Sequence, residues 1–300
     1  MYPATIVRLL RPHFAVIGLI LFVVGALYAS ALGAALSFVA LTAAYLCMLV
    51  GHLAIHAVND YFDREDDRHG TPTPFSGGSG VLQADPELAP TALALAIGLS
   101  GLSLIGTGAF LLVFGPNLWF AGLIVLALAL GWAYSAPPLR FSSRGLGEVS
   151  TAFAFVLMPG LGYAAAAGRL DAGFVPLALP LLLLGFSFIL AVELPDLEAD
   201  TLAGRRNFTV RHGRPAAARG MLVATGAAIA AYAFLAASGL EPFAAVLGGL
   251  VLSPLPFASA ALAASRMPSG RDGAIRACAR HMAALNLLMI GLGVALVAAR

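Results

Sequence analysis

Nine apolar segments of membrane-spanning length are the dominant feature of this 300-residue sequence. A helix that crosses the hydrocarbon core of a bilayer needs about 20 mainly apolar residues. Charged residues make up only 11% of the chain, against about 25% in ordinary soluble domains. The apolar windows lie near residues 13–32, 35–58, 91–114, 117–134, 146–167, 174–194, 216–239, 242–265 and 277–299. We therefore predict an all-α, polytopic transmembrane bundle of about nine helices, with residues 1–300 forming one integral-membrane domain.

The arginines predict how this bundle is oriented. With the N-terminus in the cytoplasm, 15 of the 17 basic residues fall on the cytoplasmic side, and only Arg169 and Arg300 fall outside. Membrane proteins carry such an excess of positive charge on their cytoplasmic loops. Two long loops, near residues 59–90 and 195–215, lie on that side, so we expect the functional face to be cytoplasmic. The expected location is the cytoplasmic (inner) membrane of a prokaryote.

The composition also excludes several kinds of site. The sequence contains no lysine, which rules out a lysine Schiff base and a Walker-type phosphate loop. Its two cysteines, Cys47 and Cys278, are far apart and predict neither a disulfide framework nor a metal-binding pair. The arginines form no continuous basic stripe, so no nucleic-acid partner is expected. Nothing in the pattern indicates an oligomeric state.

Two acidic clusters follow long apolar runs, at residues 59–67 and 193–200. Carboxylates at the end of a transmembrane helix are costly unless a cation neutralises them. Residues four apart share one face of a helix. The residues with this spacing are Asn59, Asp63 and Asp67, with Asp60 one step round, and Asp196 and Asp200 in the second cluster. Each cluster is therefore predicted to present a set of oxygen atoms on one helical face.

These oxygen-rich faces predict a metal site. Mg²⁺ is bound by a few carboxylates together with substrate phosphate oxygens, and no Cys/His ligand set for zinc accompanies the clusters. We therefore expect Mg²⁺ as the cofactor and a phosphorylated substrate. The arginines available to bind the remaining phosphate charge are Arg64, Arg68, Arg140, Arg144, Arg205 and Arg206. The alternative left open is that each cluster is a solvated helix end with local Arg–Asp pairs.

The order of these motifs resembles that of a known family. Residues 59–67 read Asn-Asp-x-x-Asp-x-x-x-Asp and resemble the NDxxDxxxD motif of the UbiA-type intramembrane prenyltransferases. Residues 196–213, which begin Asp-x-x-x-Asp, are similar to the second motif of that family and its tail. Between them, residues 134–148 resemble the family's inner loop. The Pro-Phe-Ser-Gly-Gly-Ser-Gly segment at 74–80 most resembles the branch that includes the naphthoate (menaquinone) enzymes.

The resemblance implies a bundle whose central cavity opens to the cytoplasmic face and laterally to membrane lipid. There, Mg²⁺ held by both acidic motifs would bind an isoprenyl diphosphate. By that resemblance the metal ligands are Asn59, Asp60, Asp63, Asp67, Asp196 and Asp200. The diphosphate-binding residues are Arg11, Arg68, Arg140, Arg144 and Arg205.

Further polar residues are candidates for catalysis. Glu193 precedes the second motif and is interpreted as the acceptor's base, a further metal ligand or a member of an ordinary ion pair. His52 and His56 precede Asn59 by seven and three residues, which places them on its helical face. This pair is either hydrogen-bonded core or an acceptor-binding group with His56 as proton acceptor. The candidate catalytic set is Asp63, Asp196, Glu193 and His56.

These features together predict Mg²⁺-dependent transfer of a polyprenyl group from an isoprenyl diphosphate to a small aromatic, quinone-precursor-like acceptor. The reaction would pass through an allylic cation, which an apolar, water-excluding bundle protects. Two alternatives use the same scaffold: a terpene cyclase that needs no acceptor, and prenyl transfer to a non-quinone acceptor. A cation transporter is a more distant alternative, because the acids cluster at one membrane face only.

Overall fold

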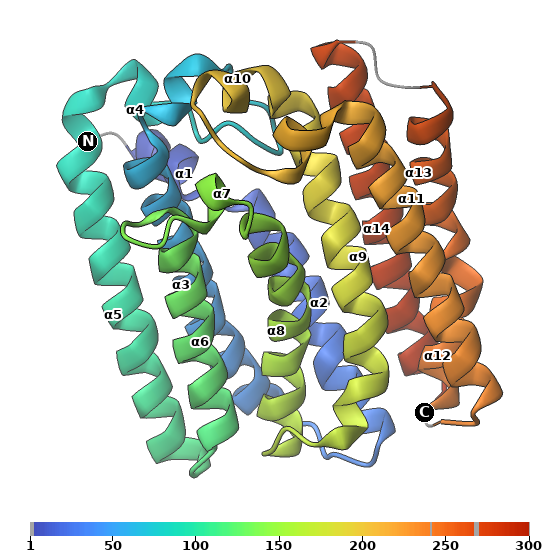
Figure 1. The fold of residues 1–300 in the computed structure, drawn as a ribbon. Helices are drawn as coiled ribbons and strands as arrows, with labels where there is room; N and C mark the ends of the chain where they lie inside the picture. The colour runs from blue at the N-terminus through green and yellow to red at the C-terminus, as the bar shows by residue number, and fades with distance from the viewer. Residues whose placement is uncertain (1–2, 241, 267–269, 300) are drawn as a thin grey trace.

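The computed structural model describes residues 3–240, 242–266 and 270–299, which form an all-helical bundle (Figure 1). The main helices are α2 (His13–Ala31), α3 (Phe38–Asp63), α5 (Ala89–Phe114), α6 (Leu118–Ser135), α8 (Gly147–Ala167), α9 (Val175–Glu193), α11 (Phe208–Ala237), α12 (Phe243–Leu252), α13 (Pro254–Arg266) and α14 (Arg271–Ala298). Short helices gather at one end of the bundle, which we call the site end: α1 (Pro3–Leu10), α4 (Val81–Ala84), α7 (Phe141–Arg144) and α10 (Leu197–Leu202). Single 3₁₀ turns are η1 (Asp66–His69), η2 (Pro86–Leu88), η3 (Ala172–Phe174) and η4 (Leu194–Asp196).

Nine helical stretches in the described ranges are long and apolar enough to cross a membrane. In that count α12 and α13 form one stretch, and α9 continues through η4 into α10. The prediction of an all-α membrane bundle is therefore confirmed. Arg300, which the orientation argument placed on the outer side, lies outside the described residues.

Two groups of helices pack on either side of α2 and α8, which contact each other. On one side α3 packs against α5 and α6, and on the other α9 packs against α11, which contacts α13. Phe110 and Phe120 belong to the hydrophobic cluster of the first group, whereas Leu184 and Leu288 belong to the larger cluster of the second. In a bilayer such contacts stabilise mainly by van der Waals packing, because lipid tails are as apolar as the side chains.

Polar caps and helix breakers determine where several helices begin and bend. The side chains of Ser37, Asn117 and Asn207 accept hydrogen bonds from backbone N–H groups three residues later, at the starts of α3, α6 and α11. Such caps satisfy N–H groups that have no partner inside the helix. Gly213 has a non-helical backbone with φ of 79°, and Pro215 follows it, so α11 is kinked near its start.

The structure corrects three of the predicted boundaries. α3 continues to Asp63 instead of ending near residue 58, so the first acidic cluster begins on the helix itself. The predicted span 242–265 is divided at Ser253 into α12 and α13, where Pro254 interrupts the helical hydrogen bonds. The predicted inner loop 195–215 is mostly helical, because η4, α10 and the first turns of α11 occupy it. These turns are polar, so a search for apolar windows does not detect them.

α2 and α8 approach each other closely because glycines lie at their contact. A Cβ atom on Gly25 would overlap the backbone of Pro159, and one on Gly162 would overlap the backbone of Phe22. Small residues allow transmembrane helices to pack backbone against backbone. Both helices also line a cavity of about 280 Å³ inside the bundle, so this contact fixes two of the cavity walls.

Gly162→Ala should destabilise the bundle by about 1–3 kcal/mol, because the added methyl group has no space between the two backbones. The matched control is Gly108→Ala on α5, where nothing lies within 4 Å of the added atom and alanine is the better helix former. The midpoint of thermal unfolding in detergent measures both variants. Equal midpoints would contradict the close contact between α2 and α8.

Candidate functional site

The first acidic motif lies at the site end of α3 and in the turn that follows it. Asn59, Asp60 and Asp63 belong to the last turns of α3, and both aspartates are buried. Asp66 and Asp67 lie in η1, so Asp67 does not share a helical face with Asn59 and Asp63 as the spacing predicted. The helix ends before Asp67, and the turn in the chain brings its carboxylate near the same arginine as Asp63.

The second acidic motif follows an interruption in the helix. α9 ends at Glu193, and the 3₁₀ turn η4 contains Pro195, which lacks a backbone N–H. The proline therefore marks the break between α9 and α10. Asp196 lies at the start of α10, and Asp200 is buried within it.

Arg205 joins the two motifs. Its guanidinium nitrogens lie 3.6 Å from Asp63, 3.4 Å from Asp66 and 3.9 Å from Asp67. On the other side they lie 3.5 Å from Asp200 of the second motif. The side chain is only 15% exposed. One buried cation therefore balances carboxylates from both acidic motifs, which the sequence had predicted to lie together.

Burial and the charges around Arg205 shift the pKa values of two groups that lie outside the membrane-spanning helices, Arg205 and Asp67. Burial alone would lower the pKa of Arg205, but the carboxylates of Asp63, Asp200 and Asp67 outweigh it and raise this pKa, so the guanidinium stays charged. Burial, reinforced by the Asp63 carboxylate, raises the pKa of Asp67 to about 7. A cation beside such a carboxyl group favours its charged form.

The loop at residues 71–80 contacts both motifs. Ser76 donates a hydrogen bond of 2.9 Å to Asp196 of the second motif. Ser79 donates to Asp60 of the first motif through its hydroxyl and through its backbone N–H. Two serines of one loop thus orient a carboxylate from each motif.

Gly78 allows this loop to lie against the first motif. Its φ is 70°, in the region that favours glycine, and a Cβ atom there would overlap the carboxylate of Asp67. Gln83 holds the same turn by donating a 2.9 Å hydrogen bond to the backbone oxygen of Asp67. The glycine-rich composition of the loop therefore has a steric reason.

Two of the predicted diphosphate-binding arginines reach the acidic motifs. Arg11 pairs with Asp60 at 3.0 Å, and Arg140 pairs with Asp66 at 3.0 Å. Both have a left-handed backbone, with φ of 45° and 43°, which other non-glycine residues in the described ranges do not adopt. Strained backbone of this kind concentrates at functional sites, where the surrounding structure enforces it.

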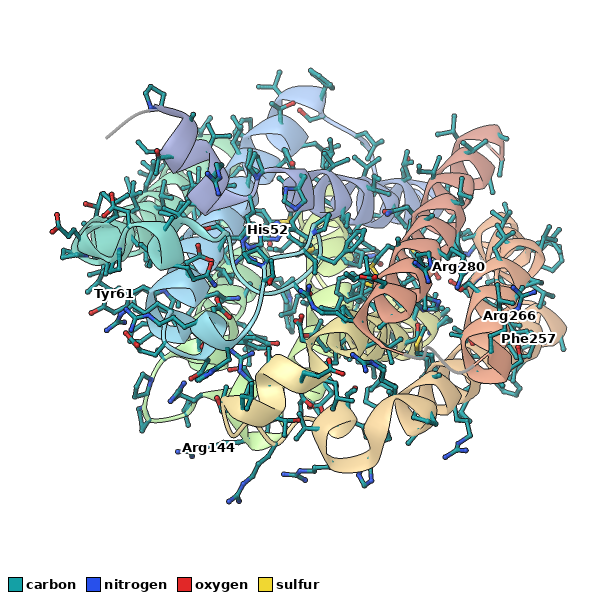
Figure 2. All side chains as sticks on the ribbon, turned by 90° about the horizontal axis from the view of Figure 1, so that it is seen from above. His52, Tyr61, Arg144, Phe257, Arg266 and Arg280 are labelled. Carbon is teal, nitrogen blue, oxygen red and sulfur yellow. The ribbon has the colours of Figure 1, made fainter. Side chains whose placement is uncertain are left out.

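Arg68 and Arg144 do not pair with the carboxylates that surround Arg205. Arg68 is half exposed and pairs with Glu65 at the surface, at 2.7 Å. Arg144 is exposed and lies at the edge of the molecule in the view from the site end, where His52 lies near the centre (Figure 2). The structure therefore brings Arg11, Arg140 and Arg205 to the site, but not these two.

Glu193 is buried against the first turn of α11. It accepts hydrogen bonds from the backbone N–H of Thr209 at 3.1 Å and from its hydroxyl at 2.8 Å. Glu148 accepts a hydrogen bond from the N–H of Phe208 in the same turn. Carboxylates at a helix N-terminus are stabilised by its free N–H groups and its dipole. These contacts give Glu193 a role in holding α11, and its catalytic role stays a prediction.

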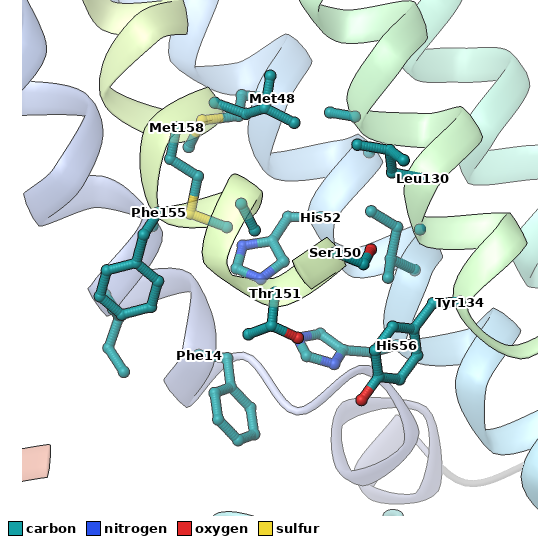
Figure 3. Close-up of a pocket in the computed structure, with 18 of the residues that line it drawn as sticks. Phe14, Met48, His52, His56, Leu130, Tyr134, Ser150, Thr151, Phe155 and Met158 are labelled. Carbon is teal, nitrogen blue, oxygen red and sulfur yellow. The ribbon is translucent and has the colours of Figure 1, made fainter. Parts of the chain in front are cut away.

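A cavity of about 280 Å³ extends into the bundle from the first motif. Its walls come mainly from α2, α3, α6, α8 and α9, with Ser103 of α5 and Phe75 of the loop at 71–80, and are mostly apolar. Asn59 belongs both to the motif and to the cavity wall. His52 and His56 project into this space from α3 (Figure 3). A charged end therefore adjoins an apolar space, which matches a ligand with a polar head and a hydrocarbon tail.

Some site residues had no distinctive signal in the sequence. Ser135, at the end of α6, donates a 2.8 Å hydrogen bond to Asp63. Asn207 donates one of 2.6 Å to Asp200. A lone serine or asparagine at a helix end is common, so only the fold reveals these contacts. The loop serines were different, because they belong to the segment at 74–80, which the sequence had already distinguished by its resemblance to the family.

The donor atoms of the two motifs suit a hard cation. Asp63 Oδ1 is buried and has no hydrogen-bond partner within the described part of the chain. In that same part, no three His, Cys, Asp or Glu side chains are arranged so that they could hold a metal ion, and Arg205 lies between the carboxylates. Carboxylate and amide oxygens without cysteine are the ligand type that Mg²⁺ prefers. The donor chemistry of these residues, and not their present arrangement around Arg205, therefore fits Mg²⁺.

Comparison with known proteins adds independent information. The model of the UbiA prenyltransferase family matches residues 18–274. Homogentisate phytyltransferase from Synechocystis sp. is 26% identical over 194 residues, 60% of this chain and 57% of that protein. Lycopene elongase/hydratase from Haloarcula japonica is 30% identical over 156 residues, 51% of this chain and 48% of that protein. The chain thus spans only about half the length of these curated relatives.

A solved structure shows the same fold. The structure of a UbiA homolog from Archaeoglobus fulgidus bound to GPP and Mg²⁺ aligns with a TM-score of 0.70 at 19% identity, over 98% of this chain and 99% of that chain. The family match covers both acidic motifs, the loop at 71–80 and most of the cavity wall. The chain belongs to the UbiA prenyltransferase family, as the resemblance of its acidic motifs predicted.

Proposed function

We propose that this protein transfers an isoprenyl group from its diphosphate to an electron-rich aromatic acceptor, with Mg²⁺ as cofactor. The observation that carries the proposal is one buried arginine, Arg205, joining both acidic motifs beside an apolar cavity. An isoprenyl diphosphate has the same division into a highly charged head and a hydrocarbon tail. Burying the tail contributes about 0.8 kcal/mol per CH₂ group relative to water.

Six residues with oxygen donors would hold the metal: Asn59, Asp60, Asp63, Asp67, Asp196 and Asp200. Bound Mg²⁺ would supply neutralisation of the diphosphate charge and so make it a better leaving group. The fit rests on the unpartnered oxygen of Asp63 and on the serine contacts that orient Asp60 and Asp196.

The protein's own residues would favour ionisation of the substrate. When the allylic C–O bond breaks, its electron pair stays on the diphosphate, and the negative charge that develops there is stabilised by nearby guanidinium groups. Arg11, Arg140 and Arg205 are held beside the acidic motifs and would supply these groups. The apolar cavity walls would keep water away from the allylic cation.

The acceptor is proposed to be an aromatic quinone precursor. Its ring carbon would attack the allylic cation and then lose a proton, which restores aromaticity. Homogentisate, for which one relative is named, is an aromatic acid, whereas lycopene, for which the other is named, is a hydrocarbon. The naphthoate-type acceptor suggested by residues 74–80 belongs to the first class. A terpene cyclase would instead form its product from prenyl diphosphate alone, so product analysis without acceptor separates the two.

We infer that the site end faces the cytoplasm. The arginines that flank the acidic motifs lie at this end, whereas Arg169 lies in the connection between α8 and η3 at the opposite end (Figure 1). Positive charge is enriched on the cytoplasmic side of membrane proteins. The diphosphate and acceptor would then enter from the cytoplasm and the adjoining leaflet.

Asp63→Asn should reduce diphosphate release from geranyl diphosphate by about 100-fold or more, because it removes charge where Arg205 meets the first motif. The matched control is Glu65→Gln, because Glu65 belongs to the same acidic cluster but is 59% exposed and pairs with Arg68. Purified protein with Mg²⁺ and a panel of aromatic acids would be assayed for released diphosphate. A wild-type rate in Asp63→Asn would contradict the proposal, as would equal losses in both variants.

Cysteines placed at the two ends should be labelled from opposite sides of the membrane. Glu65 at the site end is 59% exposed and Arg169 is 70% exposed, while the native Cys47 and Cys278 are buried. A membrane-impermeant maleimide added to intact cells should label Arg169→Cys but label Glu65→Cys only after the membrane is opened. The reverse pattern would place the site end outside.

A further inference from the structure

The second acidic motif contains a third carboxylate, Glu198, which lies between Asp196 and Asp200 in the sequence. Asp200 is buried and Asp196 is half-buried, whereas the side chain of Glu198 is 58% exposed. Residues two apart on a helix are rotated by about 200° around its axis. Glu198 therefore lies on the face of α10 opposite to the two aspartates.

Arg214 of α11 binds this opposite face. Its Nη1 and Nη2 each donate a hydrogen bond of 2.6 Å to one carboxylate oxygen of Glu198. Its Nε donates a third bond, of 2.7 Å, to the backbone oxygen of Leu194 in η4. Two parallel bonds between a guanidinium and a carboxylate fix the orientation of each group relative to the other. Arg214 thus binds α10 through a side chain and the preceding turn through the backbone.

The backbone of α11 is built to place Arg214 there. Arg214 lies between Gly213, whose φ of 79° is not helical, and Pro215, which has no backbone N–H. The Arg214 side chain is only 9% exposed. A buried charge needs a partner, and among the described residues the carboxylate that pairs with it is that of Glu198. The contact therefore differs from the freely solvated ion pairs that contribute little.

Arg214 and Arg205 make different kinds of contact with the motif. Arg205 lies 3.4 to 3.9 Å from four carboxylates, three of which are proposed metal ligands. Arg214 makes shorter bonds, and none of them goes to a proposed metal ligand in the described part of the chain. Arg205 therefore acts on the charge of the site directly. Arg214 can act on it only through the position of α10.

Two other polar contacts join the motif region to α11. Asn207 donates a hydrogen bond of 2.6 Å to Asp200, and Thr209 donates two to Glu193. Both donors precede the kink at Gly213, whereas Arg214 follows it. The Arg214 contact thus connects α10 to the long part of α11, which packs against α9 within the bundle (Figure 1).

We propose that Arg214 is a positioning residue for the second acidic motif. By holding Glu198, it sets the rotation of α10 so that Asp196 and Asp200 face the first motif. This inference rests on the proposed function, because the rotation matters for binding Mg²⁺ together with the diphosphate. Without the pair, α10 loses its charged contact on the face opposite to the aspartates. Their oxygens then have to be ordered when the ligand binds, which lowers the affinity.

The test is calorimetric titration of the full-length protein with geranyl thiodiphosphate, an analogue that resists ionisation, at a series of Mg²⁺ concentrations. The variants are Arg214→Gln, Glu198→Gln, the double variant of both, and Arg214→Lys, which keeps the charge but loses the parallel bonds. The matched control is Arg219→Gln, at an exposed arginine of the same helix that forms no ion pair with another described residue. The midpoint of thermal unfolding is measured for each protein.

Each of the three single variants at the pair should raise the Mg²⁺ concentration that half-saturates analogue binding by about tenfold. This is the change expected for losing one hydrogen bond to a charged group. The double variant should bind about as weakly as the weaker single variant, because both residues act through one contact. Arg219→Gln should bind like the wild type. Glu198→Gln changes a largely exposed side chain, so it tests the pair even if a change at buried Arg214 prevents folding.

Wild-type affinity in Glu198→Gln would overturn the proposal, because Arg214 could not then act through its partner. Losses that add independently in the double variant would overturn it too. A lower unfolding midpoint with unchanged affinity would show that the pair contributes only to stability. In each of these cases the wild type still binds the analogue with Mg²⁺. If the wild type did not bind it, the proposed function itself would fail.

Discussion

The rest of the site depends on one interaction, the contact of buried Arg205 with carboxylates from two distant parts of the chain. Charged groups at the edge of a membrane bundle are tolerated only when they are paired. Arg205 meets Asp63, Asp66 and Asp67 on one side and Asp200 on the other. Its charge holds acidic groups in a small volume that their mutual repulsion would otherwise open, and a metal–diphosphate pair can use the same oxygens.

The neighbouring apolar cavity indicates which kind of ligand this charged cluster can bind. Asn59 belongs to both, so a ligand bound at the acidic motifs has its next atoms inside the cavity. Glycine contacts between α2 and α8 hold the walls, while the serines at 76 and 79 orient one carboxylate of each motif. Among the described residues that line the cavity, Arg11, His52 and His56 carry buried nitrogens without a hydrogen-bond partner. The acidic motifs, the apolar walls and the two histidines therefore adjoin one another around one cavity.

Much of this arrangement could be predicted from the sequence, and the failures have physical reasons. Apolar windows located the spans, because lipid requires continuous hydrophobic helices, and the order of acidic motifs indicated the family. Helical spacing correctly grouped Asn59 with Asp63, but it failed for Asp67, because the helix ends before that residue. The contacts of Ser135 and Glu193 depend on which helix ends meet in space, and a single sequence carries no signal for that. Arg205 was one of several equivalent arginines until the fold placed it between the motifs.

Whether the two acidic motifs form one site is tested most directly by a double-mutant cycle on substrate binding. Calorimetric titration with geranyl thiodiphosphate in the presence of Mg²⁺ would compare the wild type, Asp60→Asn, Asp196→Asn and the double variant. Residues that act in one site are coupled, typically by about 0.5–3 kcal/mol. We predict that the double variant binds about as weakly as the weaker single variant. Losses that add independently, or wild-type affinity in either single variant, would show that the motifs do not form one metal–diphosphate site.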